Sequence, residues 1–204
     1  MTYAADCRIV LDGVARLYHA SGATAGGCGL TLAAQALETA AAIGTPAPLC
    51  LPVCRYLDAA LVSARNGPLR DIAAGFGAIA GRCTWVQNSN YVAQPPSASF
   101  LDRYGYVELV GPGRQISRAD VRVGFLMLGP ETDYPAHMHP AAEVYHVVSG
   151  DADWWHEGGD WHVERSGAAI HHPPHLPHAT RTAGAPLLAL YCWFGDIETE
   201  ARLV

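Results

Sequence analysis

One ten-residue stretch, HMHPAAEVYH, concentrates side chains that bind metal ions. His137 and His139 are two residues apart, so on a strand both side chains would point to the same face. Glu143 and Tyr145 share this odd numbering, and all four can face one barrel interior if the intervening proline only bends the chain. Burying a carboxylate beside two imidazoles is costly unless a cation compensates. The stretch therefore predicts one side of a metal centre.

The residue types around this stretch limit the kind of metal site. All but one of the ten histidines lie between His137 and His178, whereas none of the six cysteines does. A metal held there would have nitrogen and oxygen ligands, which argues against a structural zinc site built on thiolates. Such ligands favour an open catalytic site for Fe, Mn, Ni, Co or Zn. His146 has the opposite parity and is expected to pack away from the metal.

A third histidine ligand must come from another part of the chain. The segment GAAIHHPPHLPHA follows the first stretch and contains prolines that stiffen a strand edge or a turn. It offers four candidates: His171, His172, His175 and His178. Residue chemistry alone does not choose among them.

The two halves of the chain have different patterns. Up to residue 82 the pattern is helical: LTLAAQALETAAAIG is an Ala/Leu-rich run closed by Gly44 and Pro46, and PVCRYLDAALVSARNG has apolar residues at the helical interval. LRDIAAGFGAIAG predicts a third, weaker helix. From Tyr104 onward, short β-rich runs separated by turn residues indicate an all-β barrel or jelly roll.

These patterns predict an α+β chain that is mainly β. We expect a helical region over residues 1–95 to pack on a C-terminal β-barrel over residues 96–204, which contains the metal site. The segment QNSNYVAQPPSASF is rich in Asn, Ser and Pro and is predicted to be a loop-like join between the two. The helices carry few polar residues, so they are expected to be a scaffold.

Charge and composition exclude several classes of function. The net charge is −6 and all thirteen basic residues are arginine, so Schiff-base and P-loop chemistry, which need lysine, are excluded. The arginines form no stripe, and neither nucleic acid nor an acidic membrane surface is expected as a partner. The N-terminal residues lack the pattern of a signal peptide, and no run of about 18 apolar residues occurs, so a cytoplasmic location is predicted. The cysteines, including the pair Cys50 and Cys54, are interpreted as small buried hydrophobic residues.

The two histidine segments together resemble the cupin superfamily. HMHPAAEVYHVVSG fits the first cupin motif, with His137, His139, Glu143 and Gly150 at its positions. GAAIHHPPHLPH fits the second motif through Gly167, Pro173 and His178, although a histidine replaces its usual glycine and the glycine expected before the first motif is displaced to position 129. The resemblance implies a single cupin barrel in which His178 is the third imidazole ligand.

Within the cupins the chain is most similar to the bacterial dimethylsulfoniopropionate (DMSP) lyases. Tyr145 stands two residues after the glutamate, Tyr134 eleven residues before that tyrosine, and Trp193 fifteen residues after the last ligand histidine, as in that family. A helical N-terminal region before a C-terminal barrel also agrees. The resemblance is dense over about residues 130–196 and only architectural before residue 100.

The resemblance implies a β-elimination that converts a sulfonium carboxylate into acrylate and dimethyl sulfide. One divalent transition metal on His139, Glu143 and His178, with His137 as a further ligand, would bind the substrate carboxylate. Tyr145 would be the general base and Tyr134 a supporting or competing base. Aromatic side chains would surround the sulfonium cation, and the candidates are Trp154, Trp155, Trp193 and Tyr91.

Two other classes of function use the same residues. A metal cupin of different chemistry, such as a dioxygenase, an isomerase or a lyase acting on another small carboxylate, would need the same ligands, because fold and metal do not determine the reaction. A cupin that senses or binds a small molecule without turnover is the second alternative. Cupins often pair, and the apolar N-terminal helices offer a surface for a homodimer.

Overall fold

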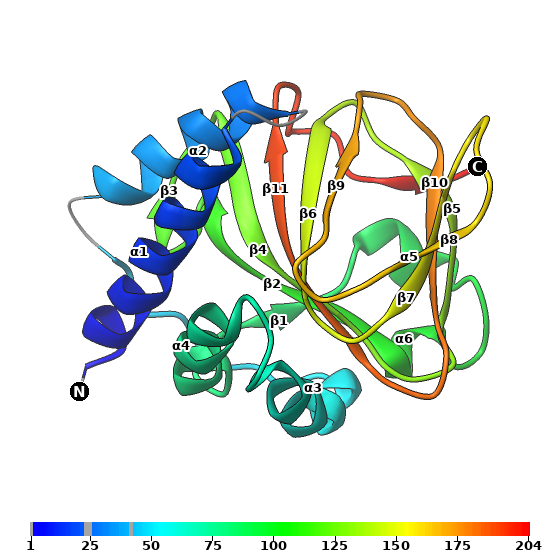
Figure 1. The fold of residues 1–204 in the computed structure, drawn as a ribbon, viewed down its shortest axis with the longest axis horizontal. Coiled ribbons are helices and arrows are strands. Elements are labelled where there is room, and N and C mark those ends of the chain that lie inside the picture. Colours follow the sequence, from blue (N-terminus) through cyan, green and yellow to red (C-terminus); the bar gives the residue numbers. More distant parts are fainter. Residues whose placement is uncertain (1, 23–25, 41–42) are drawn as a thin grey trace.

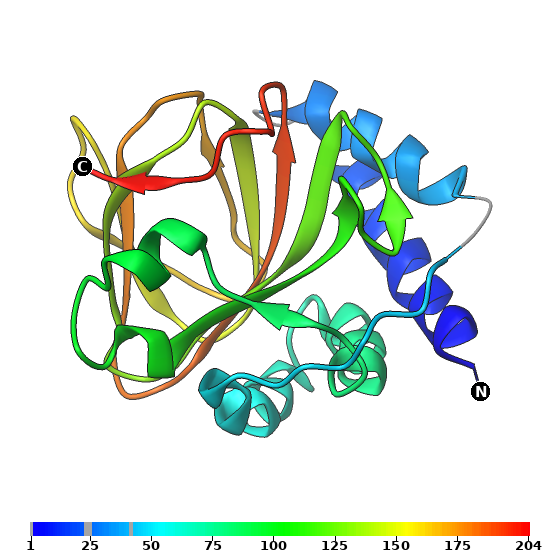
Figure 2. The same ribbon diagram turned by 180° about the vertical axis from the view of Figure 1, so that it is seen from behind.

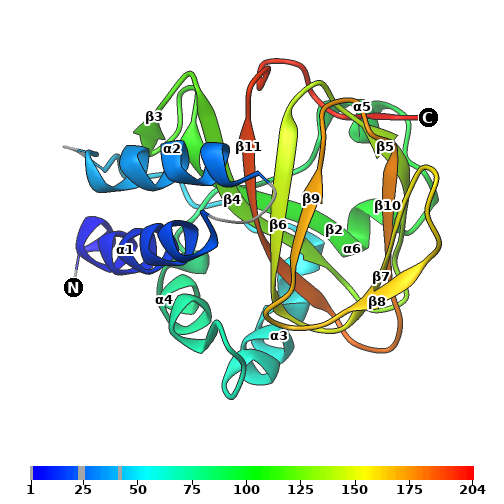
Figure 3. The same cartoon turned by 45° about the horizontal axis from the view of Figure 1, so that its top comes forward.

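The helices lie in the first part of the chain and the sheets follow. The computed structural model describes residues 2–22, 26–40 and 43–204. The helical part consists of α1 (Tyr3–Ser21), α2 (Gly27–Glu38), the 3-10 helix η1 (Pro52–Tyr56), α3 (Leu57–Ala64) and α4 (Arg70–Ala80). Figures 1 and 3 show α1 and α2 side by side along one side of a β-barrel, with α3 and α4 below them and the barrel. None of the described helices is long and apolar enough to cross a membrane.

Two antiparallel sheets face each other and form the barrel (Figure 1). The larger has the strand order β1-β2-β4-β11-β6-β9, with β3 paired to β2 in parallel, and the smaller has the order β12-β5-β10-β7-β8. The strands of the larger sheet are β1 (Trp85–Val86), β2 (Tyr104–Gly111), β3 (Ile116–Ser117), β4 (Val121–Leu128), β6 (Ala142–Ser149), β9 (Ala169–His172) and β11 (Leu187–Phe194). Those of the smaller sheet are β5 (Asp133–Met138), β7 (Ala152–His156), β8 (His162–Glu164), β10 (His178–Thr182) and β12 (Arg202–Leu203). The predicted class, helices followed by a mainly β cupin-like barrel, is confirmed.

The central strands of the larger sheet are buried on both faces, and each face belongs to a different core. Val123, Val144 and Leu190 point outward and pack with residues of α1, α2 and α4 in one apolar cluster. Phe125 on the same face stacks on Phe76 of α4, with ring centroids 3.9 Å apart. The alternate residues point into the barrel and form a second cluster that is rich in tyrosine. The alternation explains why these strands are nearly continuous hydrophobic runs.

Several local predictions differ from the structure. The Ala/Leu-rich helix ends at Glu38, well before Gly44, because Thr39 caps it: both its backbone N–H and its hydroxyl donate to the Gln35 carbonyl oxygen, at 3.0 and 2.6 Å. Residues 41 and 42 of the predicted run lie outside the described residues. Cys28 and Cys50 are exposed and Cys54 is only partly buried, which contradicts their interpretation as buried hydrophobic residues, whereas Cys7, Cys83 and Cys192 are buried.

The join between the halves is more ordered than the predicted loop. It contains β1, which pairs with β2, and the short helices α5 (Ser89–Ala93) and α6 (Phe100–Arg103). Asn88 begins α5, because its side-chain oxygen accepts a hydrogen bond from the Asn90 N–H at 2.9 Å. The two short helices lie on the near side of the barrel in Figure 2, and Tyr91 of α5 packs on Tyr104 of β2 and Tyr134 of β5.

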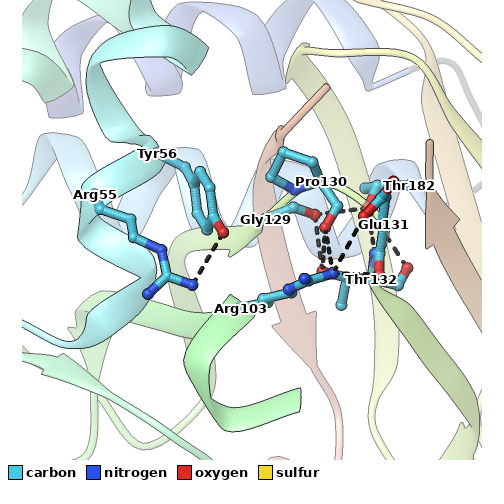
Figure 4. Close-up of polar contacts among 8 residues, drawn as sticks. All are labelled: Arg55, Tyr56, Arg103, Gly129, Pro130, Glu131, Thr132 and Thr182. Carbon is cyan, nitrogen blue, oxygen red and sulfur yellow. Dashed lines mark hydrogen bonds and ion pairs between the residues drawn. The ribbon is translucent and has the colours of Figure 1, made fainter. Parts of the chain in front are cut away.

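A hydrogen-bonded turn precedes β5 and holds the start of the strand that leads to the histidines (Figure 4). The Arg103 guanidinium donates to the carbonyl oxygens of Pro130 and Glu131, at 3.1 and 2.9 Å. The Thr182 hydroxyl of β10 donates to the Gly129 carbonyl oxygen at 2.6 Å and accepts from the Thr132 N–H at 2.9 Å. The turn is therefore tied both to α6 and to the strand that carries His178.

His146 points out of the barrel, as its parity predicts, and packs beneath α1. Its ring lies 5.7 Å from that of Tyr18, and its Nε2 lies 3.2 Å from the Ser21 hydroxyl. Burial penalises the charged imidazolium and lowers the pKa of His146 to about 4. The neutral ring is therefore part of the contact between the helical region and the sheet.

We expect His146 to weaken the fold in acid. Its folded-state pKa lies below the ordinary value of 6.5, so the unfolded chain binds the proton more readily as the pH falls from 6.5 towards 4. The contribution of His146 to the free energy of unfolding is fully present above pH 6.5, and about 3 kcal/mol of it is lost as the pH falls through the folded-state pKa. Urea unfolding of His146→Gln should show a shallower loss of unfolding free energy over this range. His162→Gln, at an exposed position, is the matched control; equal pH profiles for wild type and both variants would contradict the assignment.

Candidate metal centre

His139, Glu143 and His178 meet inside the barrel. His139 directly follows β5, Glu143 lies on β6, and His178 begins β10, where it pairs in register with His137. Nε2 of His139 lies 3.1 Å from Oε2 of Glu143, and Nε2 of His178 lies 3.4 Å from the same oxygen. One ligand atom from each residue lies within 4.8 Å of the other two, and all three side chains are buried. This buried triad is consistent with a metal site.

Backbone carbonyls orient the imidazoles of the triad. Nδ1 of His139 lies 3.0 Å from the Ala141 carbonyl oxygen, and Nδ1 of His178 lies 2.9 Å from that of Leu176. Because a carbonyl can only accept, Nδ1 carries the hydrogen and Nε2 of the neutral ring keeps its lone pair. Both lone pairs then face the Glu143 carboxylate, which is also an acceptor. Three buried acceptors at this distance repel one another unless a cation lies between them, so the donor set fits a divalent metal.

The electrostatics of the triad keep Glu143 ionised. Burial raises the pKa of this carboxyl group, but positive charge between it and the His139 and His178 nitrogens, from a proton or a bound cation, holds the pKa well below its usual range. The Trp193 indole N–H also donates to Oε1 of Glu143, at 2.6 Å, and the indole ring stacks on the His139 ring with centroids 4.0 Å apart. Trp193 therefore orients two members of the triad at once.

His137 lies beside the triad but is not one of its three members. Its ring is 4.2 Å from that of His178 and stacks almost parallel on Tyr134, with centroids 4.0 Å apart. Its Nδ1–H donates to the Pro135 carbonyl oxygen at 2.9 Å. Burial, followed by the neighbouring charge of His178, lowers the pKa of His137 well below its ordinary value, so the ring is neutral.

The four histidines of the second segment have separate positions. His178 joins the triad, while His175 lies on an exposed turn with φ of 62° and donates its backbone N–H to the His139 carbonyl oxygen. His171 and His172 point to opposite faces of β9, and only His172 enters the barrel. The His172 ring stacks on His178 at 3.9 Å, and neither of its nitrogens has a hydrogen-bond partner among the residues that the structure describes.

Sequence reasoning missed the role of His172 as a packing partner. Burial, followed by the charge of His178, lowers the pKa of His172 to about 2, which keeps the ring neutral. The signal that could have found it is its parity, since His172 and Glu143 pair across β9 and β6 and therefore share a face.

The aromatic candidates for the sulfonium wall are distributed differently from the prediction. Trp154 points into the barrel against Tyr145, at a ring distance of 5.1 Å, whereas Trp155 points to the outer face and contacts Trp161. The structure thus places Trp155 outside the predicted aromatic wall, because neighbouring residues of a strand point to opposite faces. Tyr91 lies on α5 and contacts Tyr134 through their hydroxyl groups at 3.3 Å, behind the cavity rather than in its lining.

A cavity of about 60 Å³ opens beside the triad. At one side it is lined by Glu143, Tyr145 and Trp193, and Tyr134 also borders it. Burial, followed by the charge of Glu143, raises the pKa of Tyr145 well above that of an ordinary phenol. Tyr145 is therefore a neutral phenol next to the carboxylate unless a cation offsets that charge.

Removal of a triad histidine should weaken metal binding. We expect His139→Ala and His178→Ala each to lose at least about 100-fold in affinity for a divalent metal, because each removes an oriented imidazole acceptor. Competition with a chromophoric chelator measures this affinity. His162→Ala, on the exposed strand β8, is the matched control. Unchanged affinity and stoichiometry in His139→Ala would mean that the centre lies elsewhere.

Trp193→Phe should weaken metal binding without removing a ligand atom. The variant keeps an aromatic ring against His139 but loses the N–H that orients Glu143, a change that costs about 10–100-fold in affinity. Trp155→Phe makes the same substitution on the outer face and should bind metal as the wild type does. Equal affinities in the two variants would rule out an orienting role for the indole N–H.

Comparison with known proteins agrees with this site. The model of the dimethylsulfoniopropionate lyase family matches residues 31–189, which include the whole triad. Dimethylsulfoniopropionate lyase DddQ of Ruegeria pomeroyi is 32% identical over 146 residues, or 72% of this chain and 70% of that protein. The putative dimethylsulfoniopropionate lyase DddL of Cereibacter sphaeroides is 29% identical over 163 residues, or 79% of this chain and 67% of that protein.

Solved structures of dimethylsulfoniopropionate lyases have a similar fold. A chain from the crystal structures of the DMSP lyases RdDddP and RnDddQII has a TM-score of 0.75 and 26% identity, with 98% of both chains covered. The crystal structure of DddQ from Ruegeria pomeroyi has a TM-score of 0.63 and 27% identity over 79% of this chain and 81% of that chain. Sequence, barrel and buried triad agree: the chain belongs to the dimethylsulfoniopropionate lyase family.

Proposed function

We propose that this protein cleaves dimethylsulfoniopropionate to acrylate and dimethyl sulfide with one divalent transition metal, which is Fe, Mn, Zn, Co or Ni. The proposal rests on the buried triad, in which two imidazole nitrogens face the Glu143 carboxylate. This triad lies next to a tyrosine-lined cavity, and the chain belongs to the dimethylsulfoniopropionate lyase family. Such a donor set fits a cation, and the adjacent cavity would give a small molecule access to it.

His139, Glu143 and His178 would hold the metal. His137 would become a further ligand if its imidazole ring rotated towards the metal. The metal would supply Lewis acidity, which makes the carbon next to a bound carboxylate more acidic. Trp193 would keep Glu143 in the orientation that presents Oε2 to the metal, since its N–H engages the other oxygen. The stacked rings of Tyr134 and His172 would hold the imidazoles of His137 and His178 in place.

Tyr145 is the proposed general base. Its oxygen would take the proton from the carbon next to the carboxylate; the C–H electron pair becomes the new double bond, and the C–S bond breaks with its electrons leaving on sulfur. Dimethyl sulfide departs neutral and needs no acid. Next to Glu143 the neutral phenol is favoured, so Tyr145 can act as a base only when a nearby cation offsets that carboxylate.

Tyr134 is the proposed supporting or competing base. Its hydroxyl donates to that of Tyr91 at 3.3 Å, and its ring packs on His137. Burial, followed by the charges of Tyr91 and Tyr104, raises the pKa of Tyr134 well above its ordinary value. Like Tyr145, Tyr134 could therefore act as a base only with a cation nearby, and its ring would also position His137.

The headspace above metal-reconstituted protein supplied with dimethylsulfoniopropionate should contain dimethyl sulfide. We expect Tyr145→Phe to lower the turnover number by about 10²–10⁴-fold, because proton abstraction loses its base, while metal content stays unchanged. Tyr134→Phe should have a smaller effect, and Tyr56→Phe, at a residue that is not part of the cavity lining, is the control.

Near wild-type elimination by metal-loaded Tyr145→Phe would show that the base is another residue. Oxygen consumption without acrylate would point instead to an oxygenase of the same fold. Binding of the sulfonium compound by metal-loaded protein without turnover would point to a sensor.

A further inference from the structure

Two cysteines meet on the surface at the start of η1. Cys50 is exposed and Cys54 is partly buried, and their thiols interact directly with each other. Cys28 of α2 is also exposed, but it has no thiol partner among the residues that the structure describes. The other cysteines are buried: Cys7, Cys83 and Cys192. In the described part of the chain, an accessible thiol therefore meets a second thiol at Cys50 and Cys54.

A backbone turn at the start of η1 holds the two thiols together. Leu51 is extended, with φ of −107° and ψ of 164°, and Pro52 begins the helix. The Cys54 N–H donates to the Leu51 carbonyl oxygen at 2.9 Å, which closes the turn between the two cysteines. Because the ring of Pro52 fixes its φ, the turn is kept in place. A bond between the two sulfur atoms therefore needs little movement of the backbone.

The neighbours of Cys54 anchor η1 to the barrel. Val53 is buried against β2, where a Cβ at Gly105 would lie 3.0 Å from its Cγ1. Tyr56 covers Gly129 of the turn before β5, where a Cβ would lie 2.5 Å from the Tyr56 Cε2 (Figure 4). The helix is thus held against the barrel on both sides of Cys54, and the turn that brings the thiols together is part of the folded structure.

The two thiols differ in reactivity. Burial raises the pKa of Cys54 to about 11, so this thiol is neutral at neutral pH and is a poor nucleophile. Cys50 is exposed to solvent, so a small oxidant reaches it first. The arrangement gives one accessible thiol and one partner that is held next to it.

We propose that Cys50 and Cys54 form a site of reversible oxidation, at which hydrogen peroxide converts the two thiols into a disulfide. The Cys50 sulfur attacks one peroxide oxygen, the O–O bond breaks, and the other oxygen leaves as water with the thiol proton, which gives a sulfenic acid. The Cys54 sulfur then attacks the sulfenic sulfur, the S–O bond breaks, and a second water leaves with the Cys54 proton. The sulfur atoms lose two electrons, which reduce the peroxide.

The location of this disulfide makes it reversible and independent of the proposed function. A disulfide that is exposed to solvent is readily reduced by a small thiol. Neither cysteine lines the cavity beside the metal centre, so the oxidation does not rest on the elimination reaction.

Mass spectrometry of folded protein treated with hydrogen peroxide tests the site. Cys28→Ser removes the other exposed thiol. Trypsin then releases the pair in one peptide, residues 17–55, because the chain has no lysine and no arginine between Arg16 and Arg55. After alkylation in denaturant, this peptide should carry no alkyl group and should be lighter by two hydrogen atoms than the unalkylated dithiol. Dithiothreitol before alkylation should return it to the doubly alkylated form.

Variants with one cysteine of the pair, made in the Cys28→Ser protein, give the second arm. With Cys54→Ser, the Cys50 sulfenic acid has no second thiol to attack it, so peroxide should carry this residue on to sulfinic acid. With Cys50→Ser, the Cys54 thiol should be oxidised about tenfold more slowly than Cys50, because burial keeps it neutral. Equal rates for the two variants would overturn the assignment of Cys50 as the thiol that reacts first.

Three other results would overturn the proposal itself. The first is sulfinic acid at Cys50, without a disulfide, in protein that has both thiols. The second is a disulfide that forms only between two protein molecules. The third is a bond that forms only after unfolding in urea, which would mean that the folded turn keeps the two thiols apart.

Discussion

The carboxylate of Glu143, buried opposite two imidazole lone pairs, is the constraint on which the rest of the structure depends. Three acceptors inside a barrel repel one another, and a cation among them would relieve this repulsion. The fold meets this constraint from three separate places: the end of β5, the middle of β6 and the start of β10. Carbonyl groups orient the imidazoles and Trp193 orients the carboxylate, so hydrogen bonds within the protein fix the geometry of the triad.

The larger sheet can hold the buried carboxylate because its two faces pack against different parts of the molecule. Its outer face packs on the helices in an ordinary apolar core, which makes the strands rigid. Its inner face can then carry Glu143, Tyr145 and Glu108 beside large aromatic rings. His146 shows the same division: it is adjacent to Tyr145 in sequence but contributes to the contact with α1. The helical region thus acts as a scaffold for the chemistry inside the barrel.

The two ends of the cavity carry different side chains. The triad lies at one end, and the opposite wall has tyrosine rings and a second buried carboxylate. The neutral state of Tyr145 belongs to the same arrangement, because an acidic neighbour suppresses ionisation of the phenol until a cation is present.

The sequence by itself determined the class of the fold and the first half of the site. Two-residue periodicity placed Glu143 and Tyr145 on one face and His146 on the other, and such alternation is a local property of strands. Spacing within the second motif selected His178 by resemblance. Only the tertiary structure decided that Trp154 faces inward while Trp155 does not, that His172 packs on His178, and that Glu108 meets Tyr191 across Gly124. These contacts depend on the register between strands far apart in the chain, which local spacing does not encode.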